Sequence, residues 1–312
     1  MGKIRFDFLA RYNQRHGVPL RSQVLGHIAD LNRFFSGSLA PLANAWLASR
    51  PLRFAMEKIL GVSSHRTLPA FARQPFTDWF ADRPATGPID RAEVVLFNDT
   101  WNTYNTPHVA IAATEVLESA GLRITLPGHG CCGRPMISKG LLDEARLAAR
   151  DTVEKLAPLA DRGLPIIGLE PSCILTLRDE YRYLLPEDPR VDRIDELAMT
   201  FEEFLAQQLQ LRQLDLRFSG RRRRLLLHGH CHEKALVGTG PSQRVLSLPP
   251  GHSVTEIDSG CCGMAGSFGY EAEHYAISLE MAERALLPAI RDTAAEAVIG
   301  ASGTSCRQQI EH

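Results

Sequence analysis

An adjacent pair of cysteines followed by a glycine occurs twice in this chain, in GHGCCGRP (residues 128–135) and in DSGCCGMAGSFG (residues 258–269). A single cysteine follows each pair, Cys173 in the first half and Cys306 in the second. An apolar run ends 31 residues before the first pair, at Thr100, and 30 residues before the second, at Cys231. Self-similarity at a fixed period is strong evidence about fold. We therefore predict two copies of one structural unit, with a threonine in the first copy where the second has a cysteine.

Length and composition limit the class of protein. At 312 residues the chain can hold two domains of ordinary size, and 44% hydrophobic with 23% charged residues is typical of globular proteins. A formal net charge of −1 argues against a general nucleic-acid binder, and no apolar run is long enough to predict a transmembrane segment. Seven cysteines, an odd number with two adjacent pairs, make a poor disulfide framework and favour a reducing compartment.

Strands and helices alternate in both halves of the chain. The elements expected in the first half are strands at 93–99, 123–129 and 164–173 and helices at 106–120 and 141–159. The second half repeats this order from 225 to 306, with a helix at 272–290. Such alternation predicts an α/β fold of two tandem, similar lobes with mainly parallel sheets. All the cysteines then fall at the ends of strands, where open α/β sheets bind their ligands.

Three segments lie outside the repeated unit. Residues 20–35 carry apolar side chains at helical spacing, and prolines divide the following stretch into short helices. Residues 63–92 contain four prolines without periodicity and predict a surface linker. A helix is expected at 196–211 in the connector. The predicted organisation is a helical N-terminal arm and linker (1–92), a first cysteine-rich lobe (93–185), a helical connector (186–220) and a second cysteine-rich lobe (221–312).

The four thiols of the second half predict a metal site. They are Cys231, Cys261, Cys262 and Cys306. Thiolates bind soft metals well, and a thiol in a reducing compartment rarely has a disulfide partner. Zinc sites more often take two cysteines separated by two residues, whereas the sulfurs of an adjacent pair can bind different irons of a cluster. We therefore favour an iron–sulfur site over zinc, and buried cysteines packed as small hydrophobic residues are the alternative without a metal.

Three histidines, His228, His230 and His232, flank Cys231. On a continuous strand their side chains would point to one face and that of Cys231 to the other. We therefore predict that they support the ligands, where hydrogen bonds to sulfur would tune a reduction potential, rather than bind metal themselves. Gly263 permits the turn that an adjacent pair of ligands needs. The glycine-rich run that follows misses the spacing of a nucleotide-binding loop.

These motifs resemble a known family. The stretches HGHCHEKA (228–235), CCGMAGSFGYE (261–271) and SGTSCRQQ (302–309), with CCGRPMISKGLL and GLEPSC before them, are similar to the tandem cysteine-rich (CCG) lobes of several oxidoreductase components. These components are the B subunit of heterodisulfide reductase, the iron–sulfur subunit of glycolate oxidase and the C subunit of anaerobic glycerol-3-phosphate dehydrogenase. The motifs look closest to the C-terminal iron–sulfur part of FAD-linked oxidases that resemble D-lactate or D-2-hydroxyglutarate dehydrogenases.

The resemblance implies a cofactor and its ligands. Each lobe of the heterodisulfide reductase protein holds a non-cubane 4Fe–4S cluster on a Cys…Cys-Cys…Cys-x-x-Cys pattern. The second lobe here matches at its four cysteines but lacks the other cysteine of Cys-x-x-Cys, so we expect one 4Fe–4S cluster there, with a non-cubane form as a variant. The first lobe matches only in part and is expected to be empty, to bind another metal or to lend a thiol to its neighbour. Its matching residues are Cys131, Cys132 and Cys173.

The resemblance also implies partners. FAD on a partner subunit or missing domain would oxidise a 2-hydroxy acid of the D-lactate or D-2-hydroxyglutarate type. Electrons would pass through a ferredoxin-type iron–sulfur module and this chain to a quinone or other acceptor, so the isolated chain would lack complete dehydrogenase activity. The expected location is the cytoplasm. A peripheral position at the inner face of the membrane is the alternative. Two alternatives stay open, namely thiol/disulfide chemistry like that of heterodisulfide reductase and a structural zinc-binding scaffold.

Overall fold

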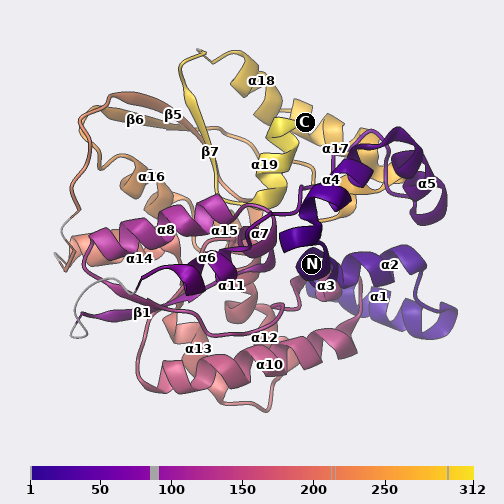
Figure 1. Cartoon of the computed structure of the whole chain (residues 1–312), viewed down its shortest axis with the longest axis horizontal. Helices are drawn as coiled ribbons and strands as arrows, with labels where there is room; N and C mark the ends of the chain where they lie inside the picture. The colour runs from indigo at the N-terminus through magenta and orange to yellow at the C-terminus, as the bar shows by residue number, and fades with distance from the viewer. Residues whose placement is uncertain (1, 85–90, 212, 215, 294) are drawn as a thin grey trace.

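The computed structural model describes residues 2–84, 91–211, 213, 214, 216–293 and 295–312. It confirms the predicted α/β class, with two parallel sheets and a helical N-terminal region (Figure 1). The first sheet has the strand order β2-β1-β3-β4 and the second the order β6-β5-β7. The strands are β1 Glu93–Phe97, β2 Arg123–Thr125, β3 Ile166–Gly168, β4 Ala198–Thr200, β5 Arg223–His228, β6 His252–Glu256 and β7 Val298–Ala301.

The duplication seen in the sequence is present in the topology. In each sheet the first strand of the repeat, β1 or β5, lies in the centre, with the second strand on one side and the third on the other. Every pairing between these strands is parallel. The carboxyl ends of corresponding strands therefore deliver corresponding residues to the same edge of each sheet.

The first sheet is covered by helices on both faces. Successive residues of β1 point to opposite faces, so Val95 and Phe97 join one apolar cluster and Val94 and Leu96 join another. All four are buried, as expected for a parallel sheet inside two helical layers. The helices around this sheet are α7 Thr100–Tyr104, α8 Pro107–Ser119, α9 Arg134–Ser138, α10 Leu142–Asp161, α11 Pro171–Arg178 and α12 Glu180–Leu184 of the first lobe, and α13 Arg190–Leu197 and α14 Phe201–Gln210 of the connector.

The second lobe has a smaller apolar cluster, to which Cys262 and Cys306 themselves belong. Its helices are α15 Cys231–Leu236, α16 Gly240–Leu246, α17 Tyr275–Glu283, α18 Leu286–Arg291 and α19 Thr304–Glu311, with 3-10 turns at Phe268–Tyr270 and Ala272–His274. The continuous helix predicted at 272–290 is wrong, because it is divided into a 3-10 turn and two helices. Pro288 offers a physical reason, since proline cannot donate to the carbonyl of residue 284.

Two predicted elements need correction in the first lobe and connector. The strand expected at 164–173 ends at Gly168, and Cys173 lies in the first turn of α11, because Glu170 caps that helix and Pro171 starts it. The helix expected at 196–211 starts only at Phe201, where Thr200 and Glu203 form a capping box. The residues before it form β4, which extends the first sheet by one strand.

The N-terminal arm, which we define as residues 2–62, is almost entirely helical. Its elements are α1 Gly2–His16, α2 Leu20–Gly26, α3 Ile28–Phe35, the 3-10 turn Gly37–Leu39, α4 Ala40–Ala48 and α5 Arg50–Leu60. The following segment, predicted as a surface linker, contains α6 Phe76–Asp82, and Phe76 is fully buried against the first lobe. That part of the linker prediction is wrong, and residues 85–90 of it lie outside the described residues.

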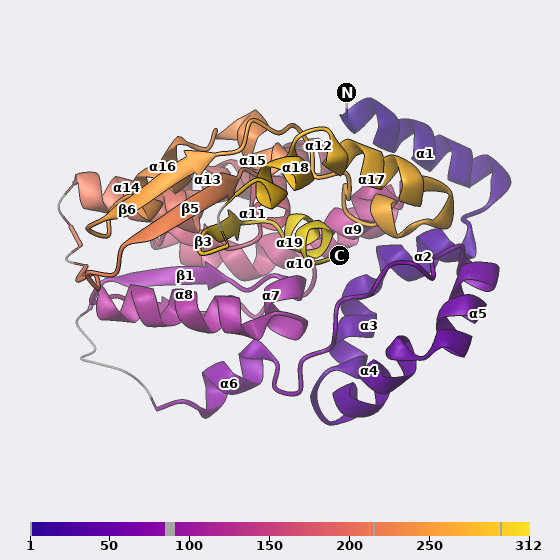
Figure 2. The ribbon, with the colours of Figure 1, turned by 90° about the horizontal axis from the view of Figure 1, so that it is seen from above.

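The arm contacts both lobes (Figure 2). In α1, the ammonium of Lys3 pairs with Asp179 of the first lobe at 2.7 Å. In α2, Arg21 forms a bidentate ion pair with Glu273 of the second lobe, with contacts of 2.8 and 2.5 Å. Just beyond the arm, the buried guanidinium of Arg66 donates to the carbonyl of Gly269 at 3.0 Å. Among the described residues, no helix is both long and apolar enough to cross a bilayer.

Candidate metal centre

The second lobe gathers its four predicted cysteine ligands at the carboxyl ends of its strands. Cys231 is the first residue of α15, just after β5, and the Cys261-Cys262 pair lies in the turn after β6. Cys306 lies in the first turn of α19, after β7. Cys262 and Cys306 are buried, Cys261 is half-buried and Cys231 is exposed, and all four thiols are free. The site is therefore deep on one side and open to solvent at Cys231.

The thiols form one connected group. Hydrogen bonds join Cys231 to Cys261, Cys261 to Cys262 and Cys262 to Cys306. The sulfurs of Cys262 and Cys306 and a ring nitrogen of His228 lie within 4.8 Å of one another. Such a set of soft sulfur donors on three separate loops suits a cluster or a thiolate-bound metal.

The protonation states of these thiols depend on one another. The hydrogen bond from Cys231 lowers the pKa of Cys261 to about 2, and the hydrogen bond from Cys262 lowers the pKa of Cys306 to about 5. The same hydrogen bonds, together with burial, raise the pKa values of Cys231 and Cys262 above the ordinary range. Four thiolates therefore repel one another here unless a cation compensates their charge, which is the role of iron or zinc in such a set.

The glycine after the cysteine pair is required by the packing. Gly263 has φ +90°, and a Cβ at this position would lie 2.1 Å from the carbonyl oxygen of Ser278. Its backbone N–H points to the sulfur of Cys261 at 3.4 Å. The first lobe has the same turn, since Gly133 has φ +83° and its N–H points to Cys131 at 3.5 Å. Only a residue without a side chain fits the Gly263 position without displacing backbone.

The three histidines do not share a strand face, so that prediction is wrong. The strand ends at His228, and His230 caps α15 by accepting the N–H of His232 at 3.2 Å. Helix formation from Cys231 onward ends the alternation on which the prediction depended. His230 instead packs against Gly303, where a Cβ would lie 2.3 Å from its Cδ2 atom. His232 turns toward the first lobe, where its ring is grouped with Asp179 and Glu180.

His228 is the last residue of β5 and is the predicted histidine that lies beside the cysteine ligands. It is fully buried, and its Nδ1 is hydrogen-bonded to the hydroxyl of Ser259 at 2.8 Å. Its Nε2 has no hydrogen-bond partner in the described part of the chain. A ring nitrogen of this residue is close to two cysteine sulfurs, so it can donate to a sulfur or bind a metal.

The first lobe repeats the arrangement with one substitution. Thr100 is the first residue of α7, as Cys231 is of α15, and Cys173 is the third residue of α11, as Cys306 is of α19. Hydrogen bonds connect Thr100, Cys131, Cys132 and Cys173 in sequence. The structure thus places Thr100 where the fourth thiol of a complete set would lie.

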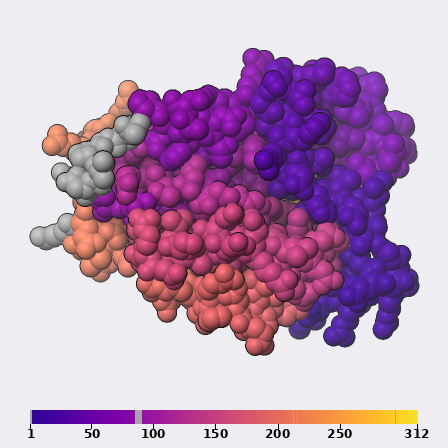
Figure 3. Space-filling view, turned by 60° about the horizontal axis from the view of Figure 1, so that its bottom comes forward, coloured from indigo at the N-terminus to yellow at the C-terminus, as the bar shows by residue number. Residues whose placement is uncertain are grey.

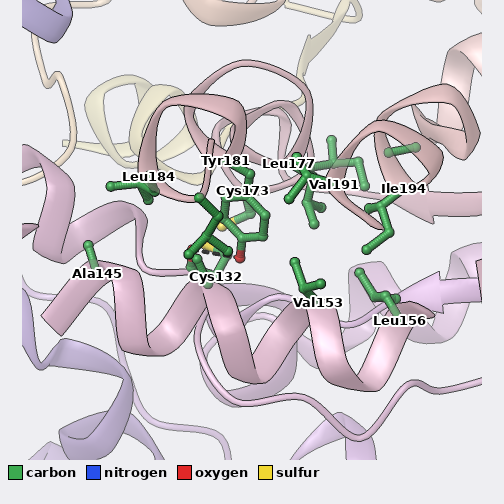
Figure 4. Close-up of a cluster of buried hydrophobic side chains, with 14 of the residues drawn as sticks. Cys132, Ala145, Val153, Leu156, Cys173, Leu177, Tyr181, Leu184, Val191 and Ile194 are labelled. Carbon is green, nitrogen blue, oxygen red and sulfur yellow. Dashed lines mark hydrogen bonds between the residues drawn. The ribbon is translucent and has the colours of Figure 1, made fainter. Parts of the chain in front are cut away.

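The first-lobe thiols are part of a packed core. Figure 4 shows Cys132 and Cys173 beside Tyr181, above α10, with the Tyr181 hydroxyl donating to the carbonyl of Cys132 at 3.0 Å. The hydrogen bond with Cys132 lowers the pKa of Cys173, but burial and the charges of Asp99 and Glu170 outweigh it and raise the pKa to about 11. Within the described residues, the groups of three close metal-binding side chains do not include these cysteines. The cysteines of the first lobe are therefore less well arranged to bind a metal than those of the second lobe.

Two helix-cap positions hold buried carboxylates in the first lobe but not in the second. Asp99 caps α7 and Glu170 caps α11, whereas the corresponding cap residues of the second lobe are His230 and Gly303. Burial and the charge of Glu170 raise the pKa of Asp99 to about 6. Negative charge beside these thiols disfavours an additional anionic set of thiolates.

Glu170 also links the two lobes. One carboxylate oxygen accepts from the Ser172 hydroxyl at 2.8 Å and from its N–H at 3.4 Å. The other accepts from the N–H of Thr304, the first residue of α19, at 2.7 Å. A single carboxylate that is 2% exposed therefore caps the helices that carry Cys173 and Cys306. Glu170 was not predicted, because glutamate is not among the residues preferred at a helix N-cap; the local signal for the start of α11 is Pro171.

The donor set fits an iron–sulfur cluster on the second lobe. Cys262 and Cys306 lie within 4.8 Å of each other and of a ring nitrogen of the buried His228, Cys261 neighbours Cys262, and Cys231 neighbours Cys261 and is exposed. The glycine turn leaves a backbone N–H directed at the sulfur of Cys261, and hydrogen bonds of this kind tune the reduction potential of a bound cluster.

Comparison with known proteins gives a consistent result. Residues 98–178 and 241–311 match the cysteine-rich domain (CCG) family. The C subunit of anaerobic glycerol-3-phosphate dehydrogenase from Escherichia coli is 30% identical over 298 residues, which are 94% of this chain and 73% of the relative. D-2-hydroxyglutarate dehydrogenase from the same organism is 25% identical over 99% of this chain but 30% of its own length. Lactate utilization protein A from Bacillus subtilis is 28% identical over 62% of this chain and 80% of the relative.

Proposed function

The chain belongs to the cysteine-rich domain (CCG) family, and on this premise we propose that it is an iron–sulfur electron-transfer module of an FAD-linked oxidoreductase. The relatives support a role in an oxidoreductase, since their names include a dehydrogenase subunit and a complete dehydrogenase. The observation that carries the proposal is the group of Cys262, Cys306 and His228 at the strand ends of the second lobe, to which Cys261 and the exposed Cys231 are joined in series.

The proposed ligands are the four second-lobe cysteines, Cys231, Cys261, Cys262 and Cys306. A 4Fe–4S cluster bound there would supply one-electron transfer between a flavin and an acceptor such as a quinone. Cys231 is the exposed member of the set, so its side of the site is the natural approach for an electron-transfer partner. His228 and the N–H of Gly263 can donate hydrogen bonds to sulfur and so adjust the reduction potential.

The proposed substrate of the whole assembly is a 2-hydroxy acid of the D-lactate or D-2-hydroxyglutarate type. The support is that relatives are named for 2-hydroxyglutarate and for lactate, both of which carry a hydroxyl beside a carboxylate. Oxidation of that alcohol would take place at FAD on a partner subunit, with a ferredoxin-type module between the flavin and this chain. We accordingly propose that the isolated chain lacks complete dehydrogenase activity.

Anaerobic reconstitution with iron and sulfide tests the proposal. We expect visible absorption, a paramagnetic signal on reduction, and about four irons per chain. Cys262→Ser should abolish these signals. Cys132→Ser, which changes the corresponding first-lobe thiol, is the matched control and should leave them intact. A colourless protein that keeps four free second-lobe thiols after reconstitution would contradict the proposal.

A second candidate is thiol/disulfide chemistry at the same centre, and the exposure of Cys231 favours it. Reduction of a small disulfide by the reconstituted chain, without any flavin partner, would support this candidate. A structural zinc site is the third candidate. It predicts stoichiometric zinc and no iron after anaerobic purification.

A further inference from the structure

A histidine and two carboxylates from different lobes meet beside the cysteine centre. Asp179 is the residue between α11 and α12, Glu180 is the first residue of α12, and His232 is the second residue of α15. One oxygen of each carboxylate and a ring nitrogen of His232 lie within 4.8 Å of one another. Because α15 packs on α11 (Figures 1 and 2), this group lies at the interface between the two lobes.

Two buried polar atoms of this group have no hydrogen-bond partner in the described part of the chain. They are Oε2 of Glu180 and Nδ1 of His232. Glu180 is only 4% exposed, and a buried polar atom normally has a partner because its loss of hydration is otherwise uncompensated. The two unpaired atoms belong to opposite lobes, so a species bound between Glu180 and His232 would satisfy both.

The surroundings indicate that this species is a cation. The group lies at the C-terminal end of α11, where the helix dipole favours positive charge. The guanidinium of Arg134 pairs with Oε1 of Glu180 and leaves the other carboxylate oxygen free. Burial raises the pKa of Glu180, because the charge of Arg134 only partly offsets it. The negative charge of this carboxylate is therefore not fully compensated by its arginine partner.

The second carboxylate is also held by one oxygen. The ammonium of Lys3 pairs with Oδ1 of Asp179 at 2.7 Å and donates to the backbone carbonyl of the same residue at 3.3 Å. Lys3 belongs to the arm, and Figure 3 shows the arm (indigo) beside the first lobe (magenta to pink). Side chains that are held in this way form a prearranged set of donors, which lowers the cost of binding a ligand.

We propose that Asp179, Glu180 and His232 bind a divalent first-row metal ion at a site separate from the cysteine centre. The set combines carboxylates, which suit Mn²⁺, with an imidazole, which suits Zn²⁺ and Fe²⁺, and it contains no sulfur. Three protein ligands leave the remaining coordination positions to water. The bound ion joins α12 of the first lobe to α15 of the second. This site goes beyond the proposed function and does not depend on a cluster.

Another group of the same composition has no free carboxylate oxygen. Glu271, Glu273 and His274 also lie within 4.8 Å of one another. Arg21 donates to both oxygens of Glu273, at 2.8 and 2.5 Å. One oxygen of Glu271 pairs with Lys139 and the other lies 3.3 Å from Arg21. All four carboxylate oxygens are thus engaged by cationic side chains, so this group is a control for the proposed site.

Titration of the full chain with Mn²⁺ tests the inference, because Mn²⁺ has little preference for thiolates and its paramagnetic signal in solution is lost on binding. The wild type should bind one Mn²⁺ per chain. Glu180→Gln and His232→Gln should each weaken binding by about ten-fold or more. The matched control His274→Gln should bind Mn²⁺ like the wild type. Mn²⁺ should also raise the melting temperature of the wild type but not that of His232→Gln, because a ligand of the folded state stabilises it.

Four outcomes would overturn the inference. They are absence of Mn²⁺ binding by the wild type, unchanged binding by His232→Gln, equal loss of binding in His232→Gln and His274→Gln, and loss of binding in Cys262→Ser, which would place the ion at the cysteine centre. Circular dichroism shows whether each variant is folded, and the partly exposed His232 provides the decisive variant if Glu180→Gln is not. Failure of the iron reconstitution would leave the Mn²⁺ result unchanged, so the two proposals fail separately.

Discussion

Replacement of Glu170 by glutamine tests whether one buried carboxylate fixes the position of the second lobe relative to the first. In the wild type this carboxylate caps α11 through Ser172 and α19 through Thr304. Glutamine has nearly the same size but keeps only one acceptor oxygen. Its NH2 group would face a backbone N–H at one of the two helix starts, where it cannot accept a hydrogen bond.

The magnitude follows from these contacts. A hydrogen bond to a charged group contributes about 1.5–3 kcal/mol, and an anion at a helix start adds about 0.3–1 kcal/mol. Loss of one such bond and of the charge at both helices therefore costs about 3–4 kcal/mol. The change also removes a repulsion that raises the pKa of Asp99, which offsets about 1 kcal/mol. We expect Glu170→Gln to lower the free energy of unfolding by about 2–3 kcal/mol.

Urea unfolding followed by circular dichroism measures this change. Glu203→Gln is the matched control, because Glu203 is also a capping glutamate but is partly exposed. It should cost about 0.5–1 kcal/mol. The Glu170 variant should also show faster alkylation of Cys306, since the start of α19 loses its anchor. Equal destabilisation in the two variants, with no change at Cys306, would refute the role of Glu170 as an anchor between lobes.

Three further predictions concern the two cysteine sets. Thr100→Cys completes the first-lobe set of thiols, because Thr100 occupies the position that corresponds to Cys231. The iron content of this variant after reconstitution should exceed that of the wild type. The further change Asp99→Asn should raise the iron content more, because it removes a negative charge beside the thiols. Asp99→Asn alone should gain about 2–3 kcal/mol of stability relative to the wild type between pH 4 and pH 8, because the pKa of Asp99 is raised in the folded protein and wild-type stability falls as pH rises through the range from about 4 to about 6. At every pH the variant loses the acceptor that Asn102 Nδ2 contacts, so unfolding experiments should compare the two proteins at both pH values. His228→Phe introduces the residue that the first lobe has at the corresponding position, Phe97, and removes a hydrogen-bond donor to sulfur. In a redox titration the reduction potential of the reconstituted centre should become more negative. An unchanged potential would exclude a hydrogen bond from His228.

The sequence was sufficient for the architecture and for the identity of the repeated positions. The alternation of strands and helices predicted parallel sheets, and the repeat of the cysteine pairs predicted two similar lobes. The first signal is local and the second is periodic, so both can be read from the sequence. The equivalence of Thr100 and Cys231 was also visible, because both follow the first strand of their lobe by a similar distance.

Features that depend on a distant partner or on a cap were not predictable in the same way. Periodicity placed Cys173, His230 and His232 on strands, but Glu170 and His230 cap helices that start there instead. β4 is only three residues long and is stabilised by pairing with β3, so its own sequence carries little signal. The bridge from Glu170 to Thr304 joins residues 134 positions apart, which no local pattern encodes.

The path of the N-terminal arm has a consequence for how the protein is made. Arg21 leaves the ribosome 252 residues before its partner Glu273, and the arm is synthesised before either lobe. At about 5–20 residues per second, the arm waits on the order of 10–50 s before its second-lobe contacts exist. During that time the arm can pack only on the first lobe, as Lys3 does with Asp179, and the side that meets the second lobe stays uncovered. Chaperones would therefore meet that side of the arm before the second lobe does, and the contacts between the arm and the second lobe are expected to form last during folding.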